Sequence, residues 1–212
     1  MELKALIFDL DGTLLDSGGL WTDIDRRFLG ARGFAVPDDY QSAVALMSPL
    51  QAAEYTIKRF GLNKKPEELA QEFHDMAVDA YRNEIGLFEG AGEYVKAVKK
   101  AGMKTALATA SPPEFYRPAL ERCGIMELFD LCVCSSGSLY KGVPEFYRYV
   151  AEKLGVDCAQ CEVYDDVYKN IAAAKDAGMK TCFIRNETFN TGLGDTAKAD
   201  RIISSFTELI RY

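Results

Sequence analysis

The chain has 212 residues, 48% hydrophobic and 27% charged, which is typical of a globular protein with one large domain or a core carrying a smaller insertion. Its 32 acidic residues outnumber its 25 basic ones, and the formal net charge of −7 argues against nucleic acid or an anionic membrane as a partner. We find no apolar window long enough to span a membrane and no secretory signal pattern, so we expect a cytoplasmic protein.

The first stretch with a clear pattern is residues 4–13, which read Lys-Ala-Leu-Ile-Phe-Asp-Leu-Asp-Gly-Thr. Its apolar run predicts a strand buried on both faces of a parallel sheet. Asp9 and Asp11 are two residues apart, so on a strand they would project to the same side where the strand ends. Ligands of open α/β sheets bind beyond such ends. Two adjacent carboxylates repel each other, so a cation or a shared proton is expected, and their hard oxygen atoms suit Mg²⁺.

Residues 16–85 have a helical pattern without a strand signal. Apolar residues recur at spacings of three and four, and glycine and proline separate the repeats. This periodicity predicts a small helical bundle inserted after the first strand. The apolar positions are Leu20, Ile24 and Phe28, then Leu50, Ala53, Ile57 and Phe60, then Leu69, Phe73, Met76 and Ala80.

From residue 86 onward the pattern alternates between strand and helix, which predicts an α/β fold with a parallel sheet and helices on both faces. We expect helices around 94–98, 113–123, 144–154 and 171–177. We expect strands at 104–109, 131–134, 162–166, 180–184 and 201–203. Residues 186–200 are rich in Thr, Gly, Asn and Asp and predict a surface loop.

Polar residues that could take part in catalysis or bind a ligand follow several of these strands, so they should meet at one edge of the sheet. They are Asp9 and Asp11, then Thr109, then Lys141, then Asp165 and Asp166. Taken singly, each residue can be interpreted as an ordinary turn, strand-end or surface residue. Their order and their positions relative to the expected strands favour a common site.

The four groups resemble the four motifs of the haloacid dehalogenase (HAD) superfamily, and the first is similar to its Asp-x-Asp-Gly-Thr motif. The resemblance covers the whole chain. It implies a Rossmann-like core domain made of residues 1–15 and 86–212, with residues 16–85 in the place of the helical cap of subclass I.

The resemblance also implies residue roles. Asp9 would be the nucleophile that takes a phosphoryl group, and Asp11 the general acid and base. Thr109 and the backbone at Ala110 would bind the phosphoryl oxygens. Lys141 would supply a positive charge for the nucleophile and the transition state.

The metal would be Mg²⁺, held by the Asp9 carboxylate, the Asp11 backbone carbonyl and Asp166. Some members of the superfamily carry another acidic residue four positions after the metal ligand. Here that position is Asn170. Asp165 would then supply any second carboxylate through water, so we rank Asp166 above Asp165 as the direct ligand.

Two further positions depart from the family pattern. Lys141 is commonly followed by proline, whereas Gly142 follows it here and loosens the expected geometry of the loop. After the acidic pair the family often has serine, whereas Val167 stands here.

The leading hypothesis is a phosphatase that acts on a small phosphorylated metabolite. Asp11 argues against dehalogenating and phosphonate-cleaving relatives, which lack it. The alternatives are a sugar phosphomutase of the beta-phosphoglucomutase type and a non-catalytic metabolite-binding module. Such mutases have a cap histidine twelve residues after the nucleophile, where this chain has Trp21, and the single histidine is His74. Trp21 either packs within the helical bundle or faces substrate.

The six cysteines include pairs with metal-like spacing, Cys132–Cys134 and Cys158–Cys161. Cys132 and Cys134 should face opposite sides of a strand, and no histidine is near either pair, so we expect reduced thiols.

Overall fold

The computed structural model describes residues 2–186 and 199–210. The chain divides into two compact units. The sheet unit comprises Met1–Gly18 and Ile85–Tyr212, and the helical unit comprises Gly19–Glu84. In this division residues 16–18 and residue 85, which the sequence pattern grouped with the helices, belong to the sheet unit.

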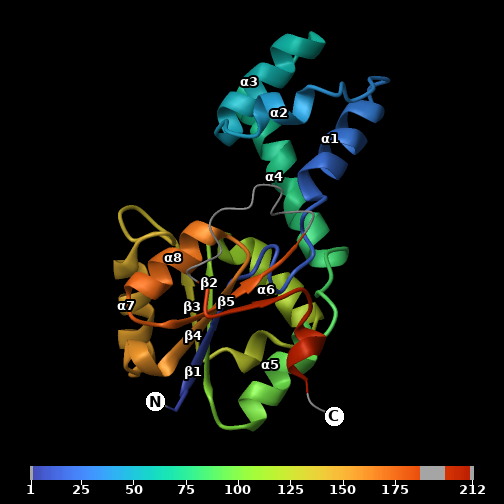
Figure 1. Ribbon diagram of the computed structural model, residues 1–212. Coiled ribbons are helices and arrows are strands. Elements are labelled where there is room, and N and C mark those ends of the chain that lie inside the picture. The colour runs from blue at the N-terminus through green and yellow to red at the C-terminus, as the bar shows by residue number, and fades with distance from the viewer. Residues whose placement is uncertain (1, 187–198, 211–212) are drawn as a thin grey trace. The chain divides into compact units, whose positions relative to one another are not determined.

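The sheet unit contains six parallel strands in the order β3-β2-β1-β4-β5-β6 (Figure 1). The central strand β1 pairs with β2 on one side and β4 on the other, so that Ile7 lies opposite Ala106 and Val163. The strand order reverses direction at β1 and β4, where open α/β sheets place their ligands. The strands are β1 Ala5–Phe8, β2 Lys104–Thr109, β3 Leu131–Cys134, β4 Cys161–Asp165, β5 Lys180–Ile184 and β6 Arg201–Ile203.

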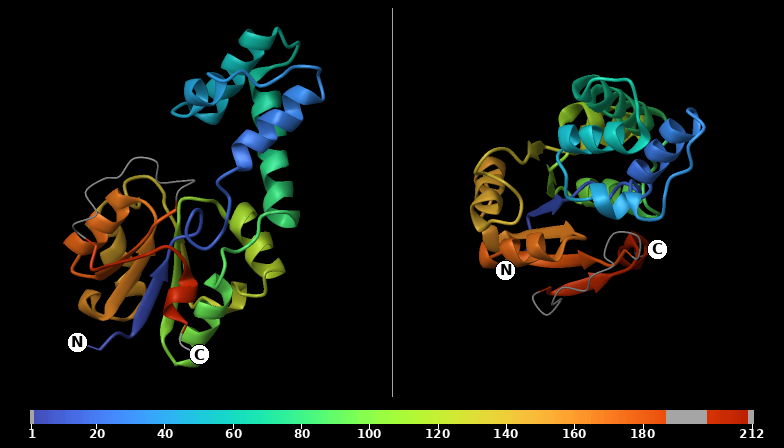
Figure 2. Two further views of the ribbon diagram at one scale, coloured as in Figure 1. Left: turned by 45° about the vertical axis from the view of Figure 1, so that its right-hand side comes forward. Right: turned by 90° about the horizontal axis from the view of Figure 1, so that it is seen from above.

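Helices cover both faces of this sheet, with α7 and α8 on one face and α5 and α6 on the other (Figures 1 and 2). Prolines occupy the first turns of α6 and α7, where a missing N–H costs nothing. The helices are α5 Ala91–Lys100, α6 Pro113–Arg122, α7 Pro144–Leu154 and α8 Tyr168–Asp176, and the 3₁₀ turns are η1 Met126–Leu128, η2 Cys158–Gln160 and η4 Phe206–Leu209.

The core of the sheet unit has two layers because successive strand residues point to opposite faces. On one face Ile7 and Val163 pack in an aliphatic cluster with α7 and α8. On the other face Phe8 stacks on Tyr164, with 5.0 Å between ring centroids, and Tyr94 of α5 adds an edge contact. Burial on both faces explains why these strands read as continuous apolar runs.

The expected α/β fold is confirmed, and four strands have the predicted bounds. The first strand is shorter than expected, since β1 ends at Phe8, and Asp9 and Asp11 lie in the turn that follows. β4 ends at Asp165, one residue before Asp166. Most of the loop expected at 186–200 lies outside the described residues.

The helical unit is built from four helices, of which α1, α3 and α4 follow the predicted periodicity, and α3 and α1 both pack against α4. The side chain of Ser48 accepts a hydrogen bond from the N–H of Gln51, and the side-chain oxygen of Gln51 accepts one from the Ser48 N–H, which caps α3. The short helix α2 was not expected, because five residues give no periodic signal. The helices are α1 Leu20–Gly30, α2 Tyr40–Val44, α3 Pro49–Phe60 and α4 Pro66–Asn83.

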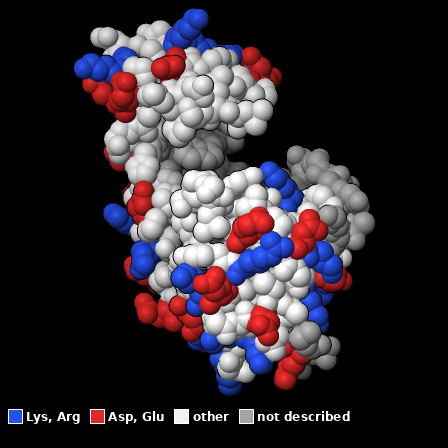
Figure 3. All heavy atoms as spheres, turned by 90° about the vertical axis from the view of Figure 1, so that its left-hand side faces the viewer, with Lys and Arg blue, Asp and Glu red and all other residues white. Residues whose placement is uncertain are grey.

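Across the described parts of both units, no helix combines the length and the apolar character that crossing a membrane requires. On the face drawn in Figure 3, basic and acidic side chains are interspersed.

One carboxylate is buried inside the helical unit. Asp25 of α1 accepts a hydrogen bond of 2.7 Å from the Gln41 side chain and a longer one from the Tyr40 hydroxyl. The Tyr40 hydroxyl also lies 2.6 Å from the hydroxyl of Thr56. Burial raises the pKa of Asp25, and the two hydrogen bonds offset this only partly. The ionised form therefore costs the folded state free energy.

We predict that Asp25→Asn stabilises the chain at neutral pH. The pKa of Asp25 is higher in the folded than in the unfolded state. Stability should therefore fall as pH rises from about 4, where an unfolded aspartate ionises. Thermal unfolding followed by circular dichroism should give equal melting temperatures for wild type and variant at low pH. The variant should melt at an increasingly higher temperature toward pH 7. Asp75→Asn, at an exposed position on α4, is the control, and a pH-independent difference for Asp25→Asn would contradict the prediction.

Candidate active site

The turn after β1 fixes the first two carboxylates. The N–H groups of residues 13–15 donate to the carbonyl oxygen of Leu10 at 2.8 to 3.3 Å. Gly12 has a φ of 83°, a conformation that residues with a Cβ rarely adopt. Asp9 and Asp11 are therefore held by a tight backbone turn rather than by a continuing strand.

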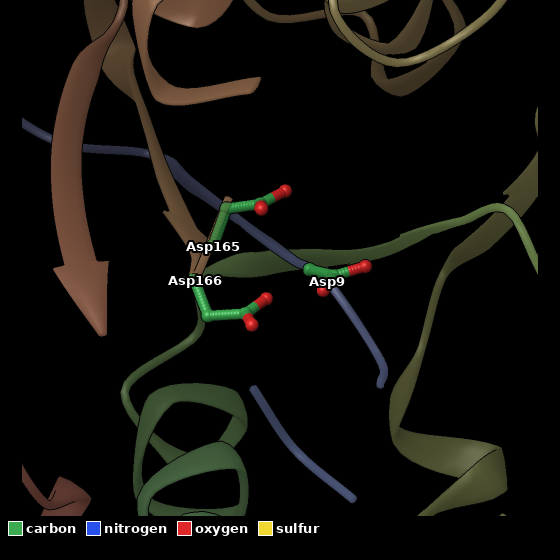
Figure 4. A group of neighbouring side chains, drawn as sticks. All are labelled: Asp9, Asp165 and Asp166. Atoms are coloured by element: carbon green, nitrogen blue, oxygen red, sulfur yellow. The ribbon is translucent and has the colours of Figure 1, made fainter. Parts of the chain in front are cut away.

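Three carboxylates from β1 and β4 meet at the carboxyl edge of the sheet (Figure 4). Asp9 follows the last residue of β1, Asp165 ends β4, and Asp166 follows it. All three are buried, and one carboxylate oxygen from each lies within 4.8 Å of the others. The parallel pairing of β1 with β4 produces this cluster, because it aligns the ends of the two strands.

Lys141 joins two of these carboxylates. Its ammonium group contacts Asp9 and lies 2.8 Å from Asp165. The Lys141 side chain is only 8% exposed. Burial alone would lower the pKa of Lys141, but the charges of Asp165 and Asp9 outweigh it and raise that pKa above its usual value. Lys141 is therefore a fixed positive charge at the reacting edge of the sheet.

Asp165 and Asp166 have different surroundings. Asp165 accepts hydrogen bonds from the Val167 N–H at 2.9 Å and the Asn170 side chain at 3.0 Å, in addition to Lys141. Asp166 accepts a longer hydrogen bond, 3.4 Å, from the buried hydroxyl of Thr13. The environment of Asp165 is thus that of a carboxylate locked in place.

The cluster would carry an excess of negative charge with all three of its carboxylates ionised. Three ionised carboxylates and one ammonium sum to −2. Burial raises the pKa of Asp9 well above its usual value, and Asp165 and Asp166 add to the effect against the opposing charge of Lys141. Burial and the charge of Asp165 raise the pKa of Asp166 to about 7. A divalent cation would balance this excess charge, and a set of hard carboxylate oxygens suits Mg²⁺ or Ca²⁺.

Asp11 lies outside this carboxylate cluster and has its own partners. Its two carboxylate oxygens accept hydrogen bonds from Ser17 at 2.7 Å and from Ser111 at 2.6 Å. A hydroxyl can donate or accept, so these serines can hold Asp11 whether or not it carries a proton. Neither serine was identified from the sequence. The position of Ser111 in the loop that follows β2 was the available signal.

Thr109 ends β2 and is fully buried, with its hydroxyl oxygen accepting a hydrogen bond from the Ser111 N–H at 2.9 Å. Because that contact uses the oxygen as an acceptor, the Thr109 hydroxyl proton remains to be donated elsewhere. Ala110 is exposed between them. Thr109, Ala110 and Ser111 thus form a short polar loop connected to Asp11.

Gly142 has a structural reason for replacing the more usual proline. Its φ is 94°, whereas proline is fixed near −65°. A Cβ at Gly142 would also lie 3.2 Å from Cε of Lys169. The loop between Lys141 and the start of α7 therefore contains a glycine with a positive φ, which proline cannot adopt.

The remaining candidates lie elsewhere. Trp21 is on α1 of the helical unit and is 52% exposed, and its contact with substrate stays a prediction. His74 is on α4 of the same unit.

All six cysteines are free thiols. Burial raises the pKa of Cys161 to about 12, which disfavours the thiolate that metal binding and redox chemistry require.

Comparison with curated proteins finds relatives over most of the chain. N-acetylmuramic acid 6-phosphate phosphatase of Pseudomonas aeruginosa is 29% identical over 193 residues, covering 87% of this chain and 83% of that protein. The phosphorylated carbohydrates phosphatase of Thermotoga maritima is 25% identical over 191 residues, covering 90% and 88%.

Among solved structures, CbbY from Rhodobacter sphaeroides in complex with phosphate superposes with a TM-score of 0.74 at 23% identity, over 98% of this chain and 96% of that one. A beta-phosphoglucomutase from Clostridium difficile gives a TM-score of 0.70 at 22% identity, over 98% and 93%. At these identities the likeness shows the fold. The model of the haloacid dehalogenase-like hydrolase family matches residues 3–178, and the chain belongs to that family.

Proposed function

We propose that the protein is a Mg²⁺-dependent phosphatase that hydrolyses a small phosphorylated metabolite, a sugar phosphate by class, through an aspartyl-phosphate intermediate. One observation carries the proposal: a single buried ammonium, Lys141, bridges Asp9 and Asp165 inside a carboxylate cluster with an excess negative charge. The curated relatives named as sugar phosphate phosphatases support the substrate class.

In the first step an oxygen of the Asp9 carboxylate attacks phosphorus. A new oxygen–phosphorus bond forms as the bond from phosphorus to the sugar oxygen breaks. Lys141, already in contact with Asp9, stabilises the negative charge on the transferring phosphoryl group. The Thr109 hydroxyl donates a hydrogen bond to a phosphoryl oxygen.

Asp11 transfers a proton in both steps. As a carboxylic acid it protonates the departing sugar oxygen, which leaves as an alcohol. As the resulting carboxylate it removes a proton from water while that water attacks phosphorus, which releases phosphate and regenerates Asp9. Ser17 and Ser111 hold the Asp11 carboxyl group through both states.

The cation would be held by the Asp9 carboxylate, the Asp166 carboxylate and the Asp11 backbone carbonyl. Asp165 would act behind them, because Lys141, Val167 and Asn170 already engage its oxygens. Bound Mg²⁺ supplies charge neutralisation that lets an anionic nucleophile approach an anionic phosphate. The helical unit would serve as the cap, with Trp21 among the residues that face substrate.

We predict that Asp9→Asn lowers kcat for phosphate release by at least about a thousandfold, because the amide is not a nucleophile. Beryllium fluoride, which forms a phosphoryl-like adduct on carboxylates, should attach to Asp9 in the wild type only. Asp157→Asn, at an exposed position before β4, is the matched control and should keep its activity. Substantial turnover by folded Asp9→Asn protein would rule out the covalent mechanism.

We predict that Asp166→Ala raises the Mg²⁺ concentration for half-maximal activity by at least about a hundredfold, since losing an outer partner of a metal site already costs about 10- to 100-fold. Asp165→Ala should mainly lower kcat, because it removes a fixed partner of Lys141. Activity would be measured across a magnesium titration, with the exposed Asp176→Ala as control. An unchanged magnesium requirement in Asp166→Ala would show that the ligand is misassigned.

We predict that water, rather than a sugar hydroxyl, accepts the phosphoryl group from Asp9. Trp21 stands where the similar mutases have a histidine, and indole has an N–H donor but no acceptor. The protein would be supplied with β-glucose 1-phosphate and related sugar phosphates with Mg²⁺, while free phosphate and isomerised sugar phosphate are measured together. Faster formation of isomerised product would favour the phosphomutase alternative.

A further inference from the structure

A buried tyrosine beneath the carboxylate cluster has no assigned role. Tyr147 lies in the first half of α7, six residues after Lys141. Its side chain is fully buried. Among the described residues its hydroxyl has no hydrogen-bond partner. Phenylalanine would fill the same space without burying an unpaired hydroxyl, so packing alone does not explain a tyrosine here.

The position of Tyr147 relates it to the site. Its ring packs in the aliphatic cluster with Ile7 of β1 and Val163 of β4. Two residues further along these strands, toward the same face, come Asp9 and Asp165. Burial raises the pKa of Tyr147 well above its usual value, and the charges of Asp165 and then Asp9 add to this. Tyr147 therefore lies on the face of the sheet toward which the two carboxylates bridged by Lys141 project, and its buried hydroxyl is a neutral donor.

Phosphoryl transfer changes the groups that the Lys141 ammonium contacts. In the structure its ammonium serves both Asp9 and Asp165. During phosphoryl transfer it must also serve the phosphoryl oxygens, which weakens its contact with Asp165. The Asp165 side chain is only 1% exposed, so water cannot easily replace the lost donor. Asp165 would keep its hydrogen bonds from Val167 and Asn170, but a further donor would offset the loss of its charged partner.

We propose that Tyr147 is a positioning residue whose hydroxyl donates to Asp165, directly or through one buried water, when the Lys141 ammonium turns to the phosphoryl group. This inference rests on the proposed phosphatase function. The Tyr147 hydroxyl would form this hydrogen bond only during phosphoryl transfer. This explains why the hydroxyl has no partner among the described residues in the resting protein.

The test compares Tyr147→Phe with wild type. With a sugar phosphate that the wild type hydrolyses, kcat should fall about threefold to tenfold, the effect of one neutral hydrogen bond, while KM stays within about twofold. The metal-free variant should melt at the same temperature as the wild type or higher, because it no longer buries an unpaired hydroxyl.

Tyr94→Phe is the matched control. Tyr94 lies on the opposite face of the sheet, where its hydroxyl is 2.6 Å from that of Tyr164. Losing that paired hydroxyl should lower the melting temperature and leave kcat unchanged. If kcat of Tyr147→Phe falls less than about threefold, if only KM changes, or if both variants lose kcat alike, the inference is overturned. If the wild type releases no phosphate from any sugar phosphate, the proposed function itself fails.

Discussion

The contact between one ammonium and two buried carboxylates constrains the rest of the site. Lys141 reaches Asp9 and Asp165 only because β1 and β4 are adjacent parallel strands whose ends are aligned. The left-handed Gly142 turns the chain directly after Lys141, which lets α7 begin at Pro144. The sheet, this loop and the start of α7 therefore act together to place a single positive charge.

The same arrangement is costly to the resting protein. Three buried carboxylates each place one oxygen within 4.8 Å of the others, and Lys141 contacts only two of them. Burial and mutual repulsion raise the pKa values of Asp9 and Asp166. Perturbed pKa values of this kind are common at functional sites. In the proposed phosphatase, a bound cation would offset the excess negative charge of the carboxylates. The phosphoryl group would be a further partner for the Lys141 ammonium.

The rest of the sheet unit provides rigidity on its other face. Phe8, Tyr164, Tyr94 and Phe206 form an aromatic layer, and Arg201 of β6 donates to Glu162 of β4 at 2.9 Å. This layer joins β1 and β4 from the side opposite Asp9 and Asp165. Close packing there can keep the two strand ends fixed while the charged face responds to ligands.

The sequence by itself determined the α/β class, the bounds of most core strands and the residues at their carboxyl ends. Continuous apolar runs, helical periodicity and breaks at Gly and Pro are local signals, and a polar residue after a buried strand is visible without a partner. Contacts between distant segments are not local. Only the tertiary structure decided that Asp165 is locked by Lys141 and Asn170 and that Ser111 holds Asp11. It also decided that the hydroxyl of Tyr147 is buried with no hydrogen-bond partner among the described residues. These relations depend on strand register and loop conformation, which arise when distant parts of the chain pack together.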